Sequence, residues 1–470
     1  MPPFSQSAPI SNGFSLSQNT QKVSNNIITI DVGGQLFQTT KQTITIGGSN
    51  TLLSNLFNSY EPNTIPFIDR DPELFSILLS LLRTGNLPSK AKHFDIQDII
   101  FEARFYGISD LLVETQSNPS QFEPFGLEKS KLLPLSGRDT PSAIAATPNG
   151  SVHVSHGSKI TSFDWSLQRK STTLTSFAAI DSLLALSHNV VAAGATDFSG
   201  LQILDLDLGF VTQTLKWENA TKSSSTVQAI GMSPDLLFTS FESGRRNSNT
   251  IMVYDVNSFK VVSEIARNEI FGADLDSAIP STKLCWVSSL NLLMASGSHS
   301  SHSGVSGNIK FWDIRSGNAV WETKETVDCF SDIAVSDTLS AVFKIGVNSG
   351  EVSYIDLRNF GSCDSWNCVG DTRKVNNNGK KVKEGFGCKI ETHGNQVFCG
   401  KQEKLELWSE VLMGSSNDGK DRIFRKNVLG RVKDLGGKRI TNMGFGGNKM
   451  FVTRKDEQCV EVWQSSVRRL

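Results

Sequence analysis

The stretch Ile309-Lys310-Phe311-Trp312-Asp313-Ile314-Arg315-Ser316-Gly317 decides the fold. Its alternating apolar residues are typical of a buried β-strand, and the aspartate followed by Ser-Gly indicates a turn. A single strand of this kind would say little about architecture. This one has related copies through the last two-thirds of the chain, and these copies predict how that part folds.

Each copy has four residues, beginning with Ile, Leu or Val and ending with a large apolar residue. The seven copies stop immediately before Asp164, Asp205, Asp255, Asp313, Asp356, Ser409 and Gln464. In five copies the next residue is an aspartate, which we expect to cap a turn. A repeat of about 40–45 residues, lengthened by loop insertions, is the period of a propeller blade.

A second strand precedes the repeated strand, as in Val190–Gly194, Leu292–Gly297 and Gln396–Gly400. Such hairpins cannot bury both faces alone, so they are expected to stack around an axis. These strands and Trp312-Asp313 resemble WD40 repeats, which implies an all-β seven-bladed propeller over residues 127–470. The chain reaches Leu470 just after the last repeated strand, so we expect residues 131–135 to supply the missing outer strand beside Trp463.

Residues 27–114 predict a different, α+β domain. Two strand-like runs flank Gly33-Gly34, which is a β-hairpin signal rather than a phosphate loop, since a second strand follows the glycines. Asp71 is a suitable N-cap for a helix that begins at Pro72, carries a leucine-rich face and closes at Gly85. A second capped helix is expected to begin near Asp95.

The same domain resembles the potassium-channel tetramerisation branch of the BTB/POZ family. The similarity rests on Val32–Thr40, Phe67–Pro72, Leu82–Gly85 and Glu102–Ile108. It implies self-association into a homo-oligomer and, as in many soluble members, docking of cullin 3. It also places four residues at an oligomer or cullin interface: Phe67, Asp69, Arg70 and Tyr106. Asp71 is expected to act mainly as a cap, whereas Arg70 fits both a turn and a pairing across subunits.

Composition bounds the remaining regions. The polar residues 1–26 predict a disordered tail, and residues 115–126 a linker. A net charge of -1 favours neither nucleic acid nor anionic membrane, and no apolar run is long enough to span a bilayer. Seven irregularly spaced cysteines fit reduced thiols, so we expect a cytoplasmic or nuclear protein.

No catalytic constellation is visible, so we expect no enzyme, cofactor or bound metal. His299 and His302 lie in the Ser/Gly-rich stretch 296–307, which predicts a flexible surface hairpin. The lysine-rich region 371–439 is interpreted as a solvated loop, with an import signal or a surface for an acidic partner as the alternative.

Three functions fit this organisation. A BTB/POZ-like domain followed by a propeller resembles plant BTB/POZ–WD40 adaptors, which connect cullin 3 to a protein recruited for ubiquitination. This resemblance implies that the propeller binds an unknown substrate protein. A non-ligase scaffold for signalling or transcription is the alternative. The third is docking to a cullin-4 adaptor through Trp312, Asp313 and Arg315, which match a Trp-Asp-x-Arg element.

Overall fold

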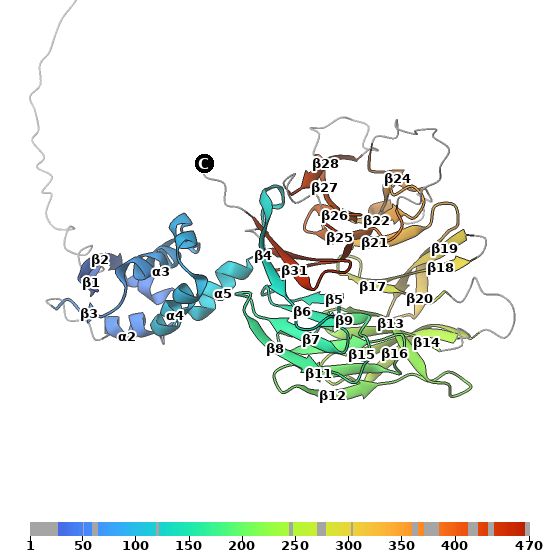
Figure 1. The fold of residues 1–470 in the computed structure, drawn as a ribbon, viewed down its shortest axis with the longest axis horizontal. Coiled ribbons are helices and arrows are strands. Elements are labelled where there is room, and N and C mark those ends of the chain that lie inside the picture. The colour runs from blue at the N-terminus through green and yellow to red at the C-terminus, as the bar shows by residue number, and fades with distance from the viewer. Residues whose placement is uncertain are drawn as a thin grey trace, which may run out of the picture. The chain divides into compact units, whose positions relative to one another are not determined.

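The computed structural model describes residues 27–49, 51–58, 64–118, 122–243, 248–269, 279–301, 304–359, 365–370, 385–411, 422–430 and 437–465. The predicted tail at 1–26 and the lysines at 380–383 lie outside these ranges. The chain divides into two compact units, Met1–Thr115 and Gln116–Leu470 (Figure 1). Each unit has its own fold.

The first unit packs helices against a small mixed sheet with strand order β2-β1-β3. Strand β1 is antiparallel to β2 and parallel to β3. The strands are β1 (Ile27–Val32), β2 (Gln35–Thr40) and β3 (Phe67–Ile68). The helices are α1 (Lys41–Thr45), α2 (Leu52–Asn58), α3 (Pro72–Thr84), α4 (Ile96–Tyr106) and α5 (Ser109–Ser117), with a 3-10 turn at Ser89–His93. None of the helices described is long and apolar enough to cross a membrane.

The glycine pair forms the turn of the β1–β2 hairpin, as predicted. Gly33 and Gly34 have φ angles of 57° and 88°, which glycine adopts without strain. A Cβ on Gly33 would lie 2.4 Å from the carbonyl oxygen of Arg70, so a larger residue would also clash. The glycine pair therefore has a structural role in the hairpin turn.

Helix α3 is the centre of the first unit. The Asp71 carboxylate accepts hydrogen bonds from the backbone N–H groups of Glu73 (2.7 Å) and Leu74 (3.2 Å), and Gly85 ends the helix in the left-handed conformation. These caps confirm the prediction. The sequence predicted one apolar face, but Ile77 and Leu79 are buried as well. A helix buried on most sides is a core element, which explains its near-continuous apolar composition.

The second unit consists of seven four-stranded antiparallel sheets, the predicted blades. Blades 1 to 3 contain β5 (Pro141–Ala146), β6 (Val152–His156), β7 (Lys159–Phe163) and β8 (Arg169–Leu174); β9 (Ser182–Ala185), β10 (Val190–Gly194), β11 (Leu201–Asp205) and β12 (Phe210–Leu215); β13 (Ser225–Met232), β14 (Leu236–Ser243), β15 (Ser248–Asp255) and β16 (Val261–Glu269). Blades 4 and 5 contain β17 (Lys283–Val287), β18 (Leu292–Ser301), β19 (Gly304–Asp313) and β20 (Asn318–Glu325); β21 (Phe330–Ser336), β22 (Ala341–Gly346), β23 (Val352–Asp356) and β24 (Asn367–Cys368). Blades 6 and 7 contain β25 (Lys389–His393), β26 (Gln396–Lys401), β27 (Lys404–Val411) and β28 (Ile423–Leu429); β29 (Ile440–Gly446), β30 (Lys449–Arg454), β31 (Cys459–Ser465) and β4 (Leu127–Pro134).

The first strand of every blade contacts the first strand of the next, and β29 returns to β5. These seven strands therefore surround the axis. Every repeated segment found in the sequence is the third strand of a blade. The aspartates that follow accept hydrogen bonds from backbone N–H groups two residues on, for example Asp205 from Asp207 (2.9 Å) and Asp356 from Arg358 (2.9 Å). The repeated aspartate is thus a turn cap, as interpreted from the sequence.

Blade 7 is completed by a strand from the opposite end of the propeller sequence. Strand β4 pairs with β31 along its length, with Leu133 opposite Val460 and Pro134 opposite Cys459 (Figure 1, teal beside red). The predicted closure is confirmed. Leu133 is 1% exposed and packs with Val460 and Val462, so the pairing also buries apolar surface.

One prediction differs from the structure. The described parts of the segment 115–126 do not form a free linker, because α5 extends to Ser117 and Phe122 packs on Phe398 and Phe445 of the propeller. Apolar contact outweighs the polar composition that suggested a linker. The Ser/Gly-rich stretch 296–307 was expected to form a hairpin, and its strands β18 and β19 do stay paired out to Ser301 and Gly304.

Truncating Leu133 to Ala should weaken ring closure. We expect a loss of about 3 kcal/mol in the free energy of unfolding, the usual cost of a cavity at a buried leucine. Leu132 is the matched control, because it lies on the same strand but is 50% exposed, and its truncation should change stability by less than about 0.5 kcal/mol. Urea unfolding of the full chain measures both. Equal losses for the two variants would contradict the role given to β4.

Candidate functional site

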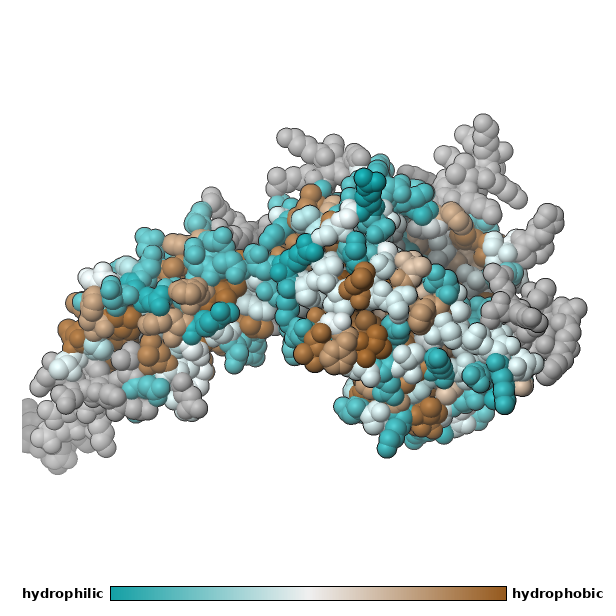
Figure 2. All heavy atoms as spheres, turned by 60° about the horizontal axis from the view of Figure 1, so that its bottom comes forward, coloured by the Kyte–Doolittle hydropathy of each residue, from teal (hydrophilic) through white to brown (hydrophobic). Residues whose placement is uncertain are grey.

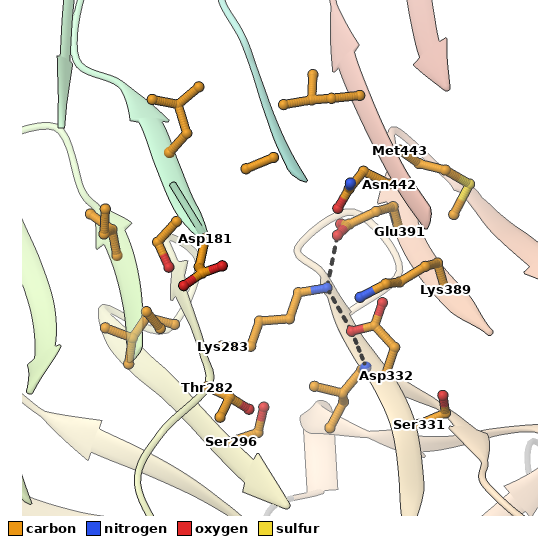
Figure 3. A pocket seen from close by; sticks show the side chains of 18 of the residues that line it. Asp181, Thr282, Lys283, Ser296, Ser331, Asp332, Lys389, Glu391, Asn442 and Met443 are labelled. Carbon is orange, nitrogen blue, oxygen red and sulfur yellow. Dashed lines mark hydrogen bonds and ion pairs between the residues drawn. The ribbon is translucent and has the colours of Figure 1, made fainter. Parts of the chain in front are cut away.

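A cavity of about 410 Å³ lies at the axis of the propeller. The first strands of all seven blades contribute to its wall (Figure 3). Since these strands meet only when the ring closes, residues almost 300 positions apart in the sequence, such as Ile144 and Met443, line the same space.

Lys283 is the centre of an ion-pair network on one side of this cavity. Its Nζ lies 3.2 Å from Asp332 Oδ1 and 2.8 Å from Glu391 Oε1, and it donates to the carbonyl of Ile390 at 3.4 Å (Figure 3). The three charged residues belong to β17, β21 and β25, so one ammonium group connects blades 4, 5 and 6. Asp332 adds a second link by accepting a hydrogen bond from the N–H of Ile390 at 3.0 Å.

The environment shifts the pKa values of the Asp332 and Glu391 carboxyl groups in opposite directions. Burial raises the pKa of Asp332, but the charges of Lys283 and Lys389 together with hydrogen bonds from backbone N–H groups outweigh burial, so its pKa lies below the usual value. Burial dominates at Glu391 and raises its pKa above the usual value. Burial also disfavours the charged form of Lys283, but its two carboxylates outweigh that effect and raise its pKa. Lys283 is thus held charged at neutral pH.

The other wall of the cavity carries Asp181, just before β9 in blade 2 (Figure 3). Its Oδ2 accepts hydrogen bonds from the N–H (2.9 Å) and hydroxyl (2.8 Å) of Thr196. Ser296 also lines the cavity and is 1% exposed, and its hydroxyl has no hydrogen-bond partner within the part of the chain that the structure describes. The cavity is therefore polar and charged, with apolar side chains between its charged groups.

In the first unit, Arg70 contacts its own chain. Its guanidinium Nη1 lies 3.1 Å from Glu102 Oε1, and its guanidinium carbon lies 3.9 Å from the ring centre of Phe105 and 5.4 Å from that of Phe101. Glu102 is 5% exposed, so Arg70 compensates a buried charge while its guanidinium group lies against the exposed aromatic rings. Whether Arg70 also pairs across subunits stays a prediction.

The other predicted interface residues of this unit have different positions. Phe67 is 62% exposed and Asp69 is exposed, so both are accessible to a partner. Tyr106 is fully buried against Phe75, with ring centres 5.2 Å apart, and burial raises the pKa of its hydroxyl. Its place is in the core, so direct contact of Tyr106 with a partner does not fit this structure.

The stretch 312–315 lies at the turn after β19. Asp313 accepts a hydrogen bond from the N–H of Arg315 at 3.1 Å and therefore caps the turn, whereas the Arg315 side chain is 94% exposed. Trp312 is half-buried beside Lys310. Ile314 and Arg315 line a groove of about 720 Å³ between blades 3 and 4, together with the exposed Val262 and Val320.

Sequence reasoning missed the axial network. Lys283, Asp332 and Glu391 are separated by 49 and 59 positions in the sequence and show no motif. The available signal was a charged residue within the first strand of three consecutive blades, where apolar residues are expected. Among the residues described, no group of three or more side chains is placed to bind a metal. The network itself joins one ammonium group to two carboxylates on neighbouring blades, and these contacts and their hydrogen bonds stabilise the ring.

Replacing Lys283 with Met should destabilise the propeller, because Asp332 and Glu391 would lose the one ammonium group that both of them contact. We expect a loss of about 2 kcal/mol at pH 7, below the 3–5 kcal/mol typical of fully buried pairs, because the Glu391 side chain is 35% exposed. The ionised Asp332 stabilises the natural chain above its unfolded pKa, and this contribution is lost as the pH falls below about 4. The difference in unfolding free energy between the natural chain and the Lys283→Met variant should therefore narrow below that pH.

Lys310→Met is the matched control, since Lys310 in the same blade pairs with Glu322, whose side chain is 54% exposed. This loss should stay under about 1 kcal/mol. Urea unfolding of the full chain at pH 7 and at about pH 3 measures both variants. A Lys283 variant as stable as the Lys310 variant would show that the network does not hold the blades together.

Both units are similar to known protein families. Residues 136–465 fit the family described as "At2g24240-like, C-terminal beta propeller", and residues 28–116 fit the BTB/POZ domain. The BTB/POZ domain-containing protein At5g41330 of Arabidopsis thaliana is 60% identical over 451 residues, covering 94% of this chain and 97% of that protein. At4g30940 of the same species is 27% identical, covering 94% of this chain and 98% of that protein.

Two further similarities are narrower. SH3KBP1-binding protein 1 of Bos taurus is 37% identical over 94 residues, which is 19% of this chain and 13% of that protein. A chain in the crystal structure of the mitotic checkpoint complex aligns with a TM-score of 0.50 and 13% identity, covering 72% of this chain and 91% of that one. The latter similarity concerns the fold alone.

Proposed function

Because the chain belongs to the At2g24240-like family of BTB/POZ proteins with a C-terminal β-propeller, we propose that it is the substrate adaptor of a cullin-3 ubiquitin ligase. In this proposal the BTB/POZ unit self-associates and binds cullin 3. The propeller binds the protein to be ubiquitinated.

The observation that carries the proposal is the exposed apolar surface of the BTB/POZ unit. Figure 2 shows hydrophobic patches on this unit, and six of its described large apolar side chains are at least half exposed: Ile27 (53%), Leu36 (60%), Ile46 (53%), Ile65 (54%), Phe67 (62%) and Phe101 (60%). Large exposed apolar side chains on so small a unit favour contacts with other proteins. Two kinds of contact, with a second copy and with cullin 3, would cover this surface.

The propeller supports the recruiting role. Strand β4 closes the ring, so the last blade has a complete outer strand. Loops that a rigid scaffold holds in place are the usual positions of binding residues. The adaptor would act by proximity, raising the concentration of the target near a ubiquitin-charged enzyme that the cullin brings. In this proposal the residues of this chain make and break no covalent bonds.

A cytoplasmic or nuclear location is part of the proposal. The cysteines within the described ranges, Cys285, Cys329, Cys368, Cys388, Cys399 and Cys459, are free thiols. Burial raises the pKa of all six thiols, to about 11 at Cys285 and Cys329, so these thiols are protonated and unreactive at neutral pH. Free thiols fit a reducing compartment.

Co-purification of cullins tests the function. We expect the full chain to retain cullin 3, and a chain lacking residues 1–115 to lose it. Phe67→Asp places a charge on the exposed apolar surface and should lower cullin-3 recovery at least about tenfold, which corresponds to 1.4 kcal/mol. Phe210→Asp is the matched control, because Phe210 is 51% exposed on the propeller and should have no effect.

The outcomes separate the alternatives. Cullin 3 retained without residues 1–115 would contradict the role of the BTB/POZ unit. No cullin with any form of the chain would instead favour a non-ligase scaffold.

A second candidate function rests on the groove between blades 3 and 4. The exposed Arg315 guanidinium beside the apolar Val262 and Val320 supports docking of a cullin-4 adaptor at this place. Recovery of cullin-4 components that Arg315→Ala abolishes, with cullin 3 absent, would favour this candidate over the first.

A further inference from the structure

The axial cavity has one carboxylate more than it has ammonium groups. Asp181, Asp332 and Glu391 line it together with Lys283 and Lys389. Lys283 is already enclosed by Asp332 and Glu391, and these three residues lie with Lys389 on the side of blades 4 to 6 (Figure 3). The remaining negative charge belongs to Asp181, which blade 2 places on the other side of the ring.

Asp181 keeps one oxygen available. Both of its hydrogen bonds, from the N–H and hydroxyl of Thr196, end on Oδ2. Among the residues that the structure describes, none donates to Oδ1. Asp181 is an exposed residue, so a cationic group that enters the cavity can reach this oxygen and donate a charge-assisted hydrogen bond to it.

Ser296 gives an independent indication of a ligand. Its residue is 1% exposed, it lines the cavity, and its hydroxyl has no partner in the described part of the chain. Buried hydroxyl groups are almost always hydrogen-bonded, so an unpaired one at a cavity wall indicates a group that enters the cavity.

Apolar side chains complete the wall. Ile144, Leu183, Ile230, Leu284 and Met443 lie between the charged groups. Lysine and arginine combine an apolar stem with a charged end, and they bury the stem along apolar surface while the charge reaches a polar partner. A cavity of about 410 Å³ that has apolar side chains and a carboxylate in its wall has room for such a side chain.

We infer that this cavity binds one basic side chain, Lys or Arg, of the protein that the propeller recruits, with Asp181 as its counter-charge. The inference rests on the proposed function and specifies its substrate class. Lys389 disfavours cations on its own side of the cavity and so directs the basic group toward Asp181. An acidic or phosphorylated segment would use Lys389 in the opposite way.

Peptide pools bound to the full-length protein test this inference. Each fluorescein-labelled pool carries one fixed central residue (Arg, Lys, Met or Glu) between randomised positions, and fluorescence anisotropy measures binding. The Arg or Lys pool should bind at least about tenfold more tightly than the Met and Glu pools. Asp181→Asn should remove most of this preference, and Ser296→Ala should weaken binding by a smaller factor.

Two variants sharpen the test. Lys389→Gln should strengthen binding of the basic pools, because it removes a like charge, whereas it would abolish binding of an acidic ligand. Asp235→Asn is the matched control, since Asp235 is an exposed carboxylate on the turn between β13 and β14, away from the cavity, and should change nothing. Urea unfolding verifies that each variant is folded.

Preference for the Glu pool, equal binding of all pools, or an Asp181→Asn variant that binds like the natural chain would overturn the inference. Its failure is distinguishable from failure of the proposed function, because Asp181→Asn leaves the BTB/POZ unit intact and should retain cullin 3. Loss of cullin 3 from the natural chain, with the preference for basic pools preserved, would overturn the ligase role and leave the cavity assignment standing.

Discussion

The pairing of β4 with β31 is the constraint on which the second unit depends. Seven hairpin-based sheets bury their faces only against neighbours, so an incomplete last blade would expose a sheet edge and loosen the contact between blades 7 and 1. The strand that completes blade 7 comes from the segment that enters the propeller, and Leu133 anchors it in the core. Closure in turn brings the seven first strands together and creates the axial cavity.

The features predicted correctly are local ones. The Gly33-Gly34 turn, the Asp71 and Gly85 caps and the aspartates after the third strands all depend on residues a few positions apart. The periodic strand pattern was enough to predict the blades, and the pairing of the segment before the first blade with the last blade was predicted as well. These signals lie within short windows, where side-chain type alone restricts the backbone.

The features missed depend on tertiary contact. Lys283, Asp332 and Glu391 come together only because three blades meet at the axis, so no spacing in the sequence could reveal them. Tyr106 was expected at an interface, but its neighbours on α3 and α4 bury it. Phe122 was assigned to a linker because polar residues surround it, yet it packs with the propeller aromatics. Burial and long-range pairing decided these cases.

In the proposed function the two units have separate tasks: the BTB/POZ unit assembles copies of the chain, and each propeller presents a binding site. Native mass spectrometry tests this claim most directly. The full chain of 51.4 kDa should give an oligomer whose mass is a multiple of that value, whereas residues 116–470 alone should give single chains. A monomeric full chain, or a propeller that oligomerises without residues 1–115, would contradict the account.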